Sequence, residues 1–373
     1  MDFSLRRIAF REIGGWSVDD VTKSFAAFRR SAVHALTEKP YRTGSLGVSH
    51  QDFAAIYQAA VAASADLGPD QARAFFEAWF APFVIEPLAD RSGHVTAFYE
   101  PVVEVSDRPD ADYLYPFLAP PPDLVRLDDL DTPPEGIPPG YAYALARGDR
   151  FGVCPDRRAI EEGAFAGAGL EIAFAKSRVD VFFAHVQGAA RLLYRDGRTS
   201  RLTYAAKSGH PFSGIGGVLV ARGEISRADS SMQSIRHWLA THAEEAEALM
   251  WENRSFIFFR PAPVDDPDLG PIAAAKVPLE PGRSMAVDRL IHTFSTPFFV
   301  SAPSLVDFDA PQPFARLMIA QDTGTAIVGP ARGDLFTGSG NVAGDKAGAV
   351  NVDAVFTVLL PSGIEPARLP GHG

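Results

Sequence analysis

Short apolar runs, broken every few residues by glycine or proline, make up the chain from Ser255 to Leu360. Proline lacks an amide donor and fits badly inside helices and central strands, so this punctuation excludes long helices and favours short strands joined by turns. Many short strands in succession are typical of a β-barrel. The strands predicted here cover residues 255–259, 284–288, 297–301, 316–321, 326–328 and 354–360.

The first part of the chain has a different periodicity. Apolar residues recur at helical spacing over 19–36 and 49–67, and a third helix is predicted over 69–81. The second of these helices opens with a capping-box sequence, Ser49–Asp52. In the next segment, 94–103, the period is two and aromatic and β-branched residues dominate, which predicts a strand that runs into a turn.

A dense proline cluster over 115–141 predicts an extended connection and marks the start of a second domain. Two domains are also expected from the length, because 373 residues exceed what one hydrophobic core usually serves. Beyond the cluster, a strand is predicted over 179–186. A hairpin follows over 191–205, where Asp196-Gly197 between alternating strands is a strong turn signal. Helices are then predicted from about Ser230, capped by the pair Ser230 and Gln233, and over 244–251.

Composition excludes some classes of protein. The net charge of −11 argues against nucleic-acid binding, which usually needs a basic surface. The single cysteine, Cys154, excludes an intramolecular disulfide, and the nine histidines show no metal-ligand spacing, so we expect no metal and no cofactor. No transmembrane helix is expected. Residues 1–16 contain neither the apolar run of a signal peptide nor a lipid-attachment cysteine.

The densest group of chemically active residues lies in 321–348, where three aspartates and seven glycines fall within 28 residues. Glycine permits tight turns and close backbone approach to a ligand, so the carboxylates Asp322, Asp334 and Asp345 are candidates for the rim of a groove. A set of surface turns, in which aspartates bond nearby amides, would give the same pattern. For an isolated segment that alternative is the better one.

The segment resembles the three-aspartate (3D) module of the membrane-bound lytic murein transglycosylase A (MltA-type) family. The residues that match its pattern are Asp322, Gly324, Ala326, Ile327, Gly329, Asp334, Phe336, Gly338, Gly340, Ala347 and Gly348. Six upstream segments fit the family in the right order: 96–101, 120–125, 179–188, 204–211, 231–236 and 278–288. This chain departs from the pattern at Ala189, where the family has serine, and at Thr325, where it has glycine.

The resemblance implies a mainly β fold with N-terminal helices, in which a smaller β-domain is inserted into a double-psi β-barrel and the substrate lies in a groove between them. We expect residues 1–105 plus 245–373 to form the barrel domain and residues 106–244 to form the insert. It further implies a peptidoglycan lytic transglycosylase. Such a lyase cleaves the β-1,4 bond between N-acetylmuramic acid and N-acetylglucosamine without water and leaves a 1,6-anhydro product.

By its position in the motif, Asp334 is the single acid that then becomes the base. That role requires a carboxyl with a raised pKa, and Asp322 is expected to hold Asp334 in place or to raise its pKa. A hydrolase would need a second working carboxyl, whereas here the substrate supplies the C6 hydroxyl. Two alternatives stay open: a hydrolase that uses both aspartates, and a peptidoglycan-binding protein without activity.

The resemblance also suggests residues that bind the substrate, and each of them has an ordinary structural role as its alternative. Tyr99 would stack on a sugar, Glu100 would bond hydroxyls, and Gln187 with Gly188 would meet acetamido groups; Lys207, Gly324 and Asp345 complete the set. The expected partners are peptidoglycan strands, not nucleic acid. The family implies a periplasmic monomer at the outer membrane, in peripheral association with the membrane or with wall-synthesis complexes.

Overall fold

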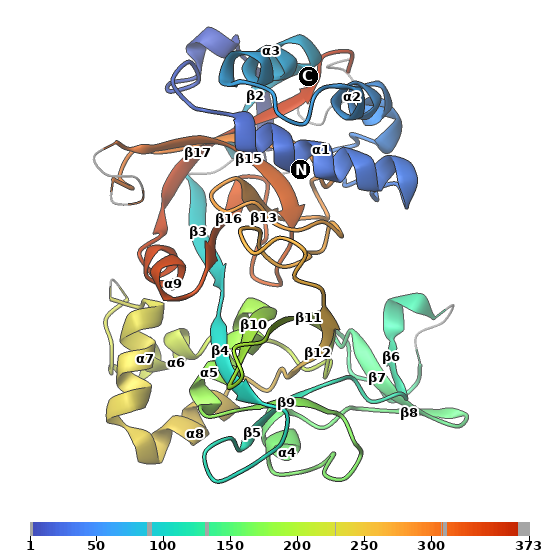
Figure 1. Ribbon diagram of the computed structural model, residues 1–373, viewed down its shortest axis with the longest axis vertical. Coiled ribbons are helices and arrows are strands. Elements are labelled where there is room, and N and C mark those ends of the chain that lie inside the picture. Colours follow the sequence, from blue (N-terminus) through green and yellow to red (C-terminus); the bar gives the residue numbers. More distant parts are fainter. Residues whose placement is uncertain are drawn as a thin grey trace. The chain divides into compact units, whose positions relative to one another are not determined.

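The computed structural model describes residues 3–87, 92–130, 134–227, 229–306, 308 and 312–364 (Figure 1). Within these residues the chain is mainly β with helices at its N-terminal end, as predicted. It divides into two compact units. The first contains Met1–Tyr99, Asp266–Gly338 and Val342–Gly373, and the second contains Glu100–Asp265 and Ser339–Asn341. Pro133 of the proline cluster lies outside the described residues. No helix in the described ranges is long and apolar enough to cross a membrane.

Within its described residues, the first unit holds one sheet of eight strands: β1 (Phe3–Arg7), β2 (Phe80–Pro87), β3 (Gly93–Glu100), β13 (Ser284–Val287), β14 (Pro297–Ala302), β15 (Phe314–Asp322), β16 (Arg332–Ser339) and β17 (Asn351–Pro361). Their order is β1-β2-β17-β14-β15-β13-β16-β3, and β17 also pairs with β3. The six strands from β17 to β3 therefore close into a barrel. Closure pairs backbone groups that an open sheet would expose at its edges.

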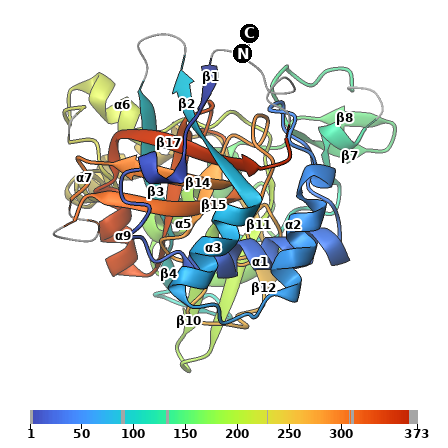
Figure 2. The same ribbon diagram turned by 90° about the horizontal axis from the view of Figure 1, so that it is seen from above.

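Three helices pack on this barrel, and all three were predicted: α1 (Thr22–Thr37), α2 (His50–Ala62) and α3 (Pro69–Trp79). Figure 2 shows them beside the strands of the first unit, and α1 contacts β15. Their apolar faces carry aromatic side chains such as Phe25, Phe28 and Phe53, which are fully buried in the core shared with the barrel. A buried ion pair between Asp19 and Arg283, 2.8 Å long, joins the start of α1 to the barrel.

The described part of the second unit contains a sheet of six strands in the order β12-β11-β10-β4-β9-β5 and a sheet of three, β6-β7-β8. The six are β4 (Val102–Ser106), β5 (Tyr115–Leu118), β9 (Glu171–Ala175), β10 (Ala189–Tyr194), β11 (Thr199–Lys207) and β12 (Ile257–Ala262), and the three are β6 (Leu124–Arg126), β7 (Tyr143–Arg147) and β8 (Arg150–Gly152). The predicted hairpin is β10–β11, and Gly197 takes a φ of 82° at its turn. The helices are α4 (Arg157–Glu161), α5 (Arg178–Gln187), α6 (Ile215–Arg222), α7 (Met232–Thr241) and α8 (Ala243–Trp251).

Two predicted strands are wrong. Residues 179–186 belong to α5, although Val179, Val181 and Phe183 alternate as in a strand. The hydroxyl of Ser177 accepts a hydrogen bond from the Asp180 amide and caps this helix, and Gly188, with a φ of 72°, ends it. Residues 326–328 form a turn and coil. The cap of α7 is also one residue later than predicted, because Ser231 bonds the Ser234 amide.

The glycine-rich segment holds one strand and one helix that its sequence did not predict, β16 and α9 (Asn341–Gly348). Its glycines allow close packing there as well as turns. A Cβ on Gly333 would lie 2.4 Å from the Met285 sulfur, and a Cβ on Gly344 would lie 2.9 Å from the Tyr99 ring. Gly338, near the end of β16, and Gly340, in the turn between the two elements, have φ values of 123° and 84°.

Candidate active site

Two aspartates lie on neighbouring strands of the barrel, on either side of one residue. Asp322 is the last residue of β15 and pairs with Ala286 of β13. Asp334 lies within β16 and pairs with Ala286 from the opposite side. Directly opposed residues point to the same face of a sheet. A β-bulge interrupts the β13–β15 register next to Ala286, and the charge of Asp334 still acts on Asp322, so both carboxyls are assigned to one face of the barrel. Two strand spacings separate them, or roughly 10 Å between their Cα atoms.

Burial raises the pKa of both carboxyls. It brings the pKa of Asp322 to about 6, although the Ala274 amide donates a hydrogen bond of 3.1 Å to its Oδ1 and opposes the shift. The negative charge of Asp334 raises the pKa of Asp322 further. Both side chains are only half-buried, so they keep some access to solvent. A raised pKa keeps a carboxyl protonated closer to neutral pH, as a general acid requires.

A chain of hydrogen bonds reaches Asp334 from its own strand and from β3. The Arg332 guanidinium donates to the Thr96 hydroxyl (Nη2···Oγ1 2.7 Å), and that hydroxyl donates to Oδ1 of Asp334. A guanidinium cannot accept, so the hydroxyl proton is left for Asp334. Burial raises the pKa of Asp334 most, whereas the Thr96 bond and the Arg332 charge lower it. The pKa of this carboxyl is therefore set by opposing effects.

Neither Thr96 nor Arg332 was predicted from the sequence as a site residue. Arg332 precedes Asp334 by two residues, and in a strand that spacing puts two side chains on one face, so a strand assignment would have found it. Thr96 lies 238 residues from Asp334 in the chain, and only the barrel closure brings them together. No local pattern in the sequence connects them.

The loop that follows Asp322 is tied back to the barrel at two points. The Thr323 hydroxyl donates to the Val287 carbonyl oxygen at 2.9 Å, and the Gly329 amide donates to the Asp288 carboxylate at 2.9 Å. Between these ties Gly324 and Thr325 are exposed. The loop thus presents an accessible backbone beside Asp322, and a contact between Gly324 and substrate stays a prediction.

Glu100 is not available to a substrate. It is fully buried, with none of its surface exposed, and its carboxylate binds the Arg201 guanidinium at 2.5 and 3.1 Å. Arg191 and the Ser339 hydroxyl also bond its Oε2, at 3.1 and 2.6 Å. The prediction that Glu100 bonds sugar hydroxyls is therefore wrong, because the two arginines of the β10–β11 hairpin already bind both of its carboxylate oxygens.

Tyr99 is also buried, with 5% of its surface exposed, and its ring packs on Gly344 of α9. The prediction that it stacks on a sugar is wrong, because the ring face is already covered within the first unit. The alternative role as a core residue is the one the structure supports.

The remaining candidates are found on separate elements. Gln187 ends α5 and is half-buried, and Gly188 accepts a hydrogen bond from the Tyr204 amide at 2.9 Å. Lys207 ends β11 half-buried, and burial lowers its pKa. Asp345 is exposed on α9 of the first unit. The structure thus brings Asp322 and Asp334 together, and the roles of the other residues in substrate binding stay predictions.

Comparison with known proteins places this geometry in a family. Two family profiles match the chain: "MltA specific insert domain" over residues 94–260 and "3D domain" over residues 283–360. The chain is 34% identical over 273 residues to the membrane-bound lytic murein transglycosylase A of Escherichia coli K12, and 33% identical over 269 residues to that of Vibrio cholerae. These matches cover 70% and 69% of the chain and 65% and 63% of the relatives.

Solved structures resemble this chain over nearly its whole length. A membrane-bound lytic murein transglycosylase from Agrobacterium tumefaciens is 52% identical, with 96% of this chain and 98% of that chain covered and a TM-score of 0.90. Escherichia coli MltA with bound chitohexaose is 26% identical, with 97% and 95% covered and a TM-score of 0.69. The chain therefore belongs to the membrane-bound lytic murein transglycosylase A family.

Proposed function

We propose that the protein is a peptidoglycan lytic transglycosylase in which Asp334 is the only acid and base. The observation that carries this proposal is a half-buried carboxyl of raised pKa beside a second one, on one face of a closed barrel. The family relationship to lytic murein transglycosylases supports the same reaction. Because the match covers 65% of the E. coli relative, the activity is a proposal for this chain.

The reaction needs one proton to move away from the enzyme and one to return. Protonated Asp334 gives its proton to the glycosidic oxygen as the bond to C1 of the muramoyl residue breaks. The ionised Asp334 then takes the proton of the C6 hydroxyl while O6 bonds C1. The products are a 1,6-anhydromuramoyl end and a free 4-hydroxyl on the N-acetylglucosamine, and the enzyme regains its starting state without consuming water.

Asp322 has a supporting role in this scheme. Because like charges disfavour each other, the two carboxyls resist being ionised together. Whenever Asp322 is ionised, it favours the protonated form of Asp334, which the first step requires. The Ala274 amide on Asp322 and the Thr96 hydroxyl on Asp334 give the two carboxyls different surroundings, and this is the usual way to separate an acid from its neighbour.

A test in water enriched in ¹⁸O separates this reaction from hydrolysis by an Asp322–Asp334 pair. Digestion of purified sacculi should give muropeptides that are one water lighter than hydrolytic products and that carry no ¹⁸O at C1. Mass spectrometry of the released ends measures both properties. Reducing ends labelled with ¹⁸O would establish a hydrolase, and binding to sacculi without any release would establish a peptidoglycan-binding protein.

Replacing Thr96 with valine should extend activity to higher pH. The Thr96 hydroxyl bonds the ionised form of Asp334 and lowers its pKa, so its loss raises that pKa. An acid works while it is protonated, and a higher pKa therefore moves the alkaline limb of the kcat/KM profile upward. Thr96→Ser keeps the hydroxyl and should keep the wild-type limb. A limb that moves down in the valine variant would contradict this account of the pKa of Asp334.

We further propose that the first unit is the catalytic barrel domain, that the second is the inserted domain, and that the substrate is the glycan strand of peptidoglycan. The position of both aspartates in the first unit supports that division, as does the match of the insert profile to residues 94–260. Chitohexaose bound to the E. coli relative supports a groove for amino-sugar polymers. The proposed place of action is the periplasmic side of the outer membrane, and the names of the relatives, which call them membrane-bound, support the association with a membrane.

A further inference from the structure

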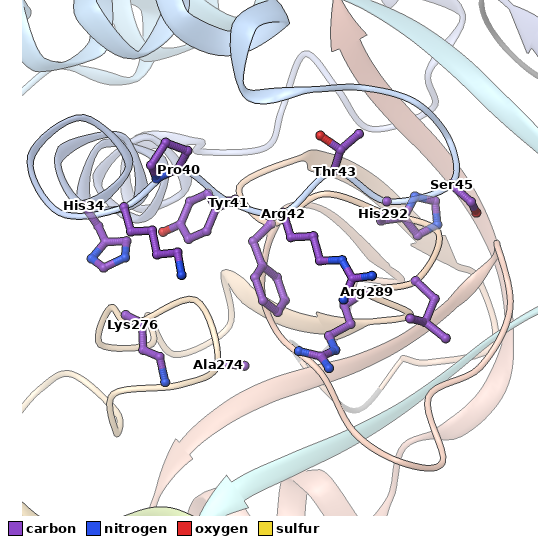
Figure 3. A pocket seen from close by; sticks show the side chains of 14 residues that line it. His34, Pro40, Tyr41, Arg42, Thr43, Ser45, Ala274, Lys276, Arg289 and His292 are labelled. Carbon is purple, nitrogen blue, oxygen red and sulfur yellow. The ribbon is translucent and has the colours of Figure 1, made fainter. Parts of the chain in front are cut away.

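A cavity of about 450 Å³ opens in the first unit (Figure 3). Three segments and His34 of α1 line it: the connection 39–45 after α1, the turn 274–276, and the residues 289–294 after β13. Its volume suits a small group or a short peptide segment, not a whole glycan strand.

The walls of this cavity are fixed by buried contacts. Tyr41 is buried, and its hydroxyl donates to the Ala275 carbonyl oxygen at 2.9 Å. Its ring lies edge-on to Phe294 at 5.9 Å. A Cβ on Gly44 would lie 2.3 Å from the Ile291 carbonyl oxygen, so the 39–45 connection is packed directly on the opposite wall. The cavity is thus part of the fold and not a gap beside a loose loop.

Four cationic side chains line the cavity, and no acidic residue does: Lys39, Arg42, Lys276 and Arg289. Figure 3 shows the side chains of Arg42, Lys276 and Arg289, each from a different wall. All four are exposed. None makes an ion pair with a carboxylate within 4 Å in the described part of the chain, although Lys276 is near enough to Asp322 for its charge to lower the pKa of that carboxyl. The whole chain has a net charge of −11, so this local excess of positive charge stands out.

A cluster of this kind favours an anion. Cations that line one cavity repel each other, and a bound anion relieves that repulsion. Guanidinium groups such as Arg42 and Arg289 match the two oxygens of a carboxylate in particular. Lys276 has a φ of 63°, which residues other than glycine rarely adopt. The turn around it holds the residue at the cavity edge.

The turn that carries Lys276 also contacts the proposed catalytic pair. The Ala274 amide donates to Asp322, and the Ala275 amide donates to the Gln321 carbonyl oxygen at 3.0 Å. The same turn therefore borders the cavity through Ala274 and Lys276 and supports Asp322 through the Ala274 amide. One turn of the chain thus connects the cavity to Asp322, the neighbour of the proposed acid.

We propose that this cavity binds carboxylates of the peptide stem carried by the muramoyl residue. This inference rests on the proposed function and names the part of the substrate that the site would recognise beside the glycan. In peptidoglycan the stem is attached to the lactyl group of muramic acid and bears several free carboxylates. An extended stem covers about 3.5 Å per residue, so two residues would carry a carboxylate about 7 Å from the sugar.

The test compares two substrates with two double variants. One substrate is glycan strands with their stems, and the other is the same strands after an amidase has removed the stems. The Arg42→Gln/Arg289→Gln variant removes both guanidiniums from the cavity. The Arg7→Gln/Arg11→Gln variant, at two exposed arginines that do not line the cavity, removes the same charge elsewhere. The measured quantity is the ratio of kcat/KM for strands with stems to kcat/KM for bare strands.

We expect the wild type to prefer strands with stems, and the cavity variant to lose that preference by roughly tenfold or more, as the loss of charge-assisted bonds implies. The Arg7/Arg11 control should keep the wild-type ratio. An unchanged ratio in the cavity variant, or an equal loss in the control, would overturn the proposal. Thermal melting of each variant shows whether it is folded.

Calorimetric titration with the purified free tetrapeptide stem provides a readout that does not depend on activity. The wild type should bind the peptide, the cavity variant should bind it at least tenfold more weakly, and inorganic phosphate should bind more weakly than the peptide. Equal binding of phosphate and peptide would indicate a general anion site and overturn the proposal. If the wild type released no anhydro ends from either substrate, the proposed function would fail, while the titration would still decide whether the cavity binds the stem.

Discussion

Asp334→Asn should abolish the release of 1,6-anhydro ends and leave the fold intact. Asparagine has nearly the shape of aspartate and can still accept the hydrogen bond from the Thr96 hydroxyl, but it has no proton of suitable acidity to donate. Loss of general acid and base catalysis in a single group costs about 10²–10⁴ for each proton transfer. Since both transfers use the same carboxyl, we expect kcat to fall by roughly 10⁴ or more.

The matched control for this prediction is Asp322→Asn. It removes a neighbouring charge but leaves the proposed acid in place, so it should reduce kcat much less than Asp334→Asn and should move the pH profile. Removing the charge of Asp322 lets the pKa of Asp334 fall, and the alkaline limb should therefore move to lower pH. Full activity of Asp334→Asn, with a wild-type melting temperature, would remove Asp334 from the mechanism. Equal losses in the two variants would instead favour a two-carboxyl mechanism.

The sequence predicted the elements whose signals are local. The helices α1, α2 and α3 carry their own apolar periodicity, and two of them carry a recognisable start, the Ser49 capping box and Pro69. The strand β16 was missed because its glycines suggest turns. In the structure Gly333 is needed where Met285 and Phe356 approach too closely for a Cβ, and that approach depends on strands far away in the sequence.

For the site, the motif identified the two aspartates but not their surroundings. The pairing of Asp322 and Asp334 with the same alanine follows from the barrel order, which short strands do not encode locally. Glu100 shows the opposite error, because a residue that was predicted to bind substrate is buried in the structure. A charged residue directly after an aromatic strand looks exposed in the sequence, and only the return of the hairpin with Arg191 and Arg201 buries it.

That buried cluster makes Arg201→Ala the substitution with the largest expected effect on stability. Arg201 has 2% of its surface exposed, and its guanidinium makes two bonds to the fully buried Glu100 carboxylate. Removing one partner of a buried pair leaves an uncompensated charge and costs about 3–5 kcal/mol. Arg191 remains near the carboxylate, so we expect the lower part of that range. Urea denaturation measures the loss in the free energy of unfolding.

The exposed pair Arg222–Glu252 of the same unit, 3.0 Å long, provides the control: Arg222→Ala should leave stability nearly unchanged, because water replaces the lost partner. Hydrogen exchange should locate the effect of Arg201→Ala in β10 and β11, since those strands hold both arginines that bind Glu100. Glu100→Gln tests the structural role from the other side. It should lower stability and leave KM for glycan strands unchanged at temperatures where the variant is folded. A stable Glu100→Gln variant with a raised KM would contradict the structural role and support a contact between Glu100 and the substrate. Only a residue that contacts the sugar would affect binding without affecting the fold.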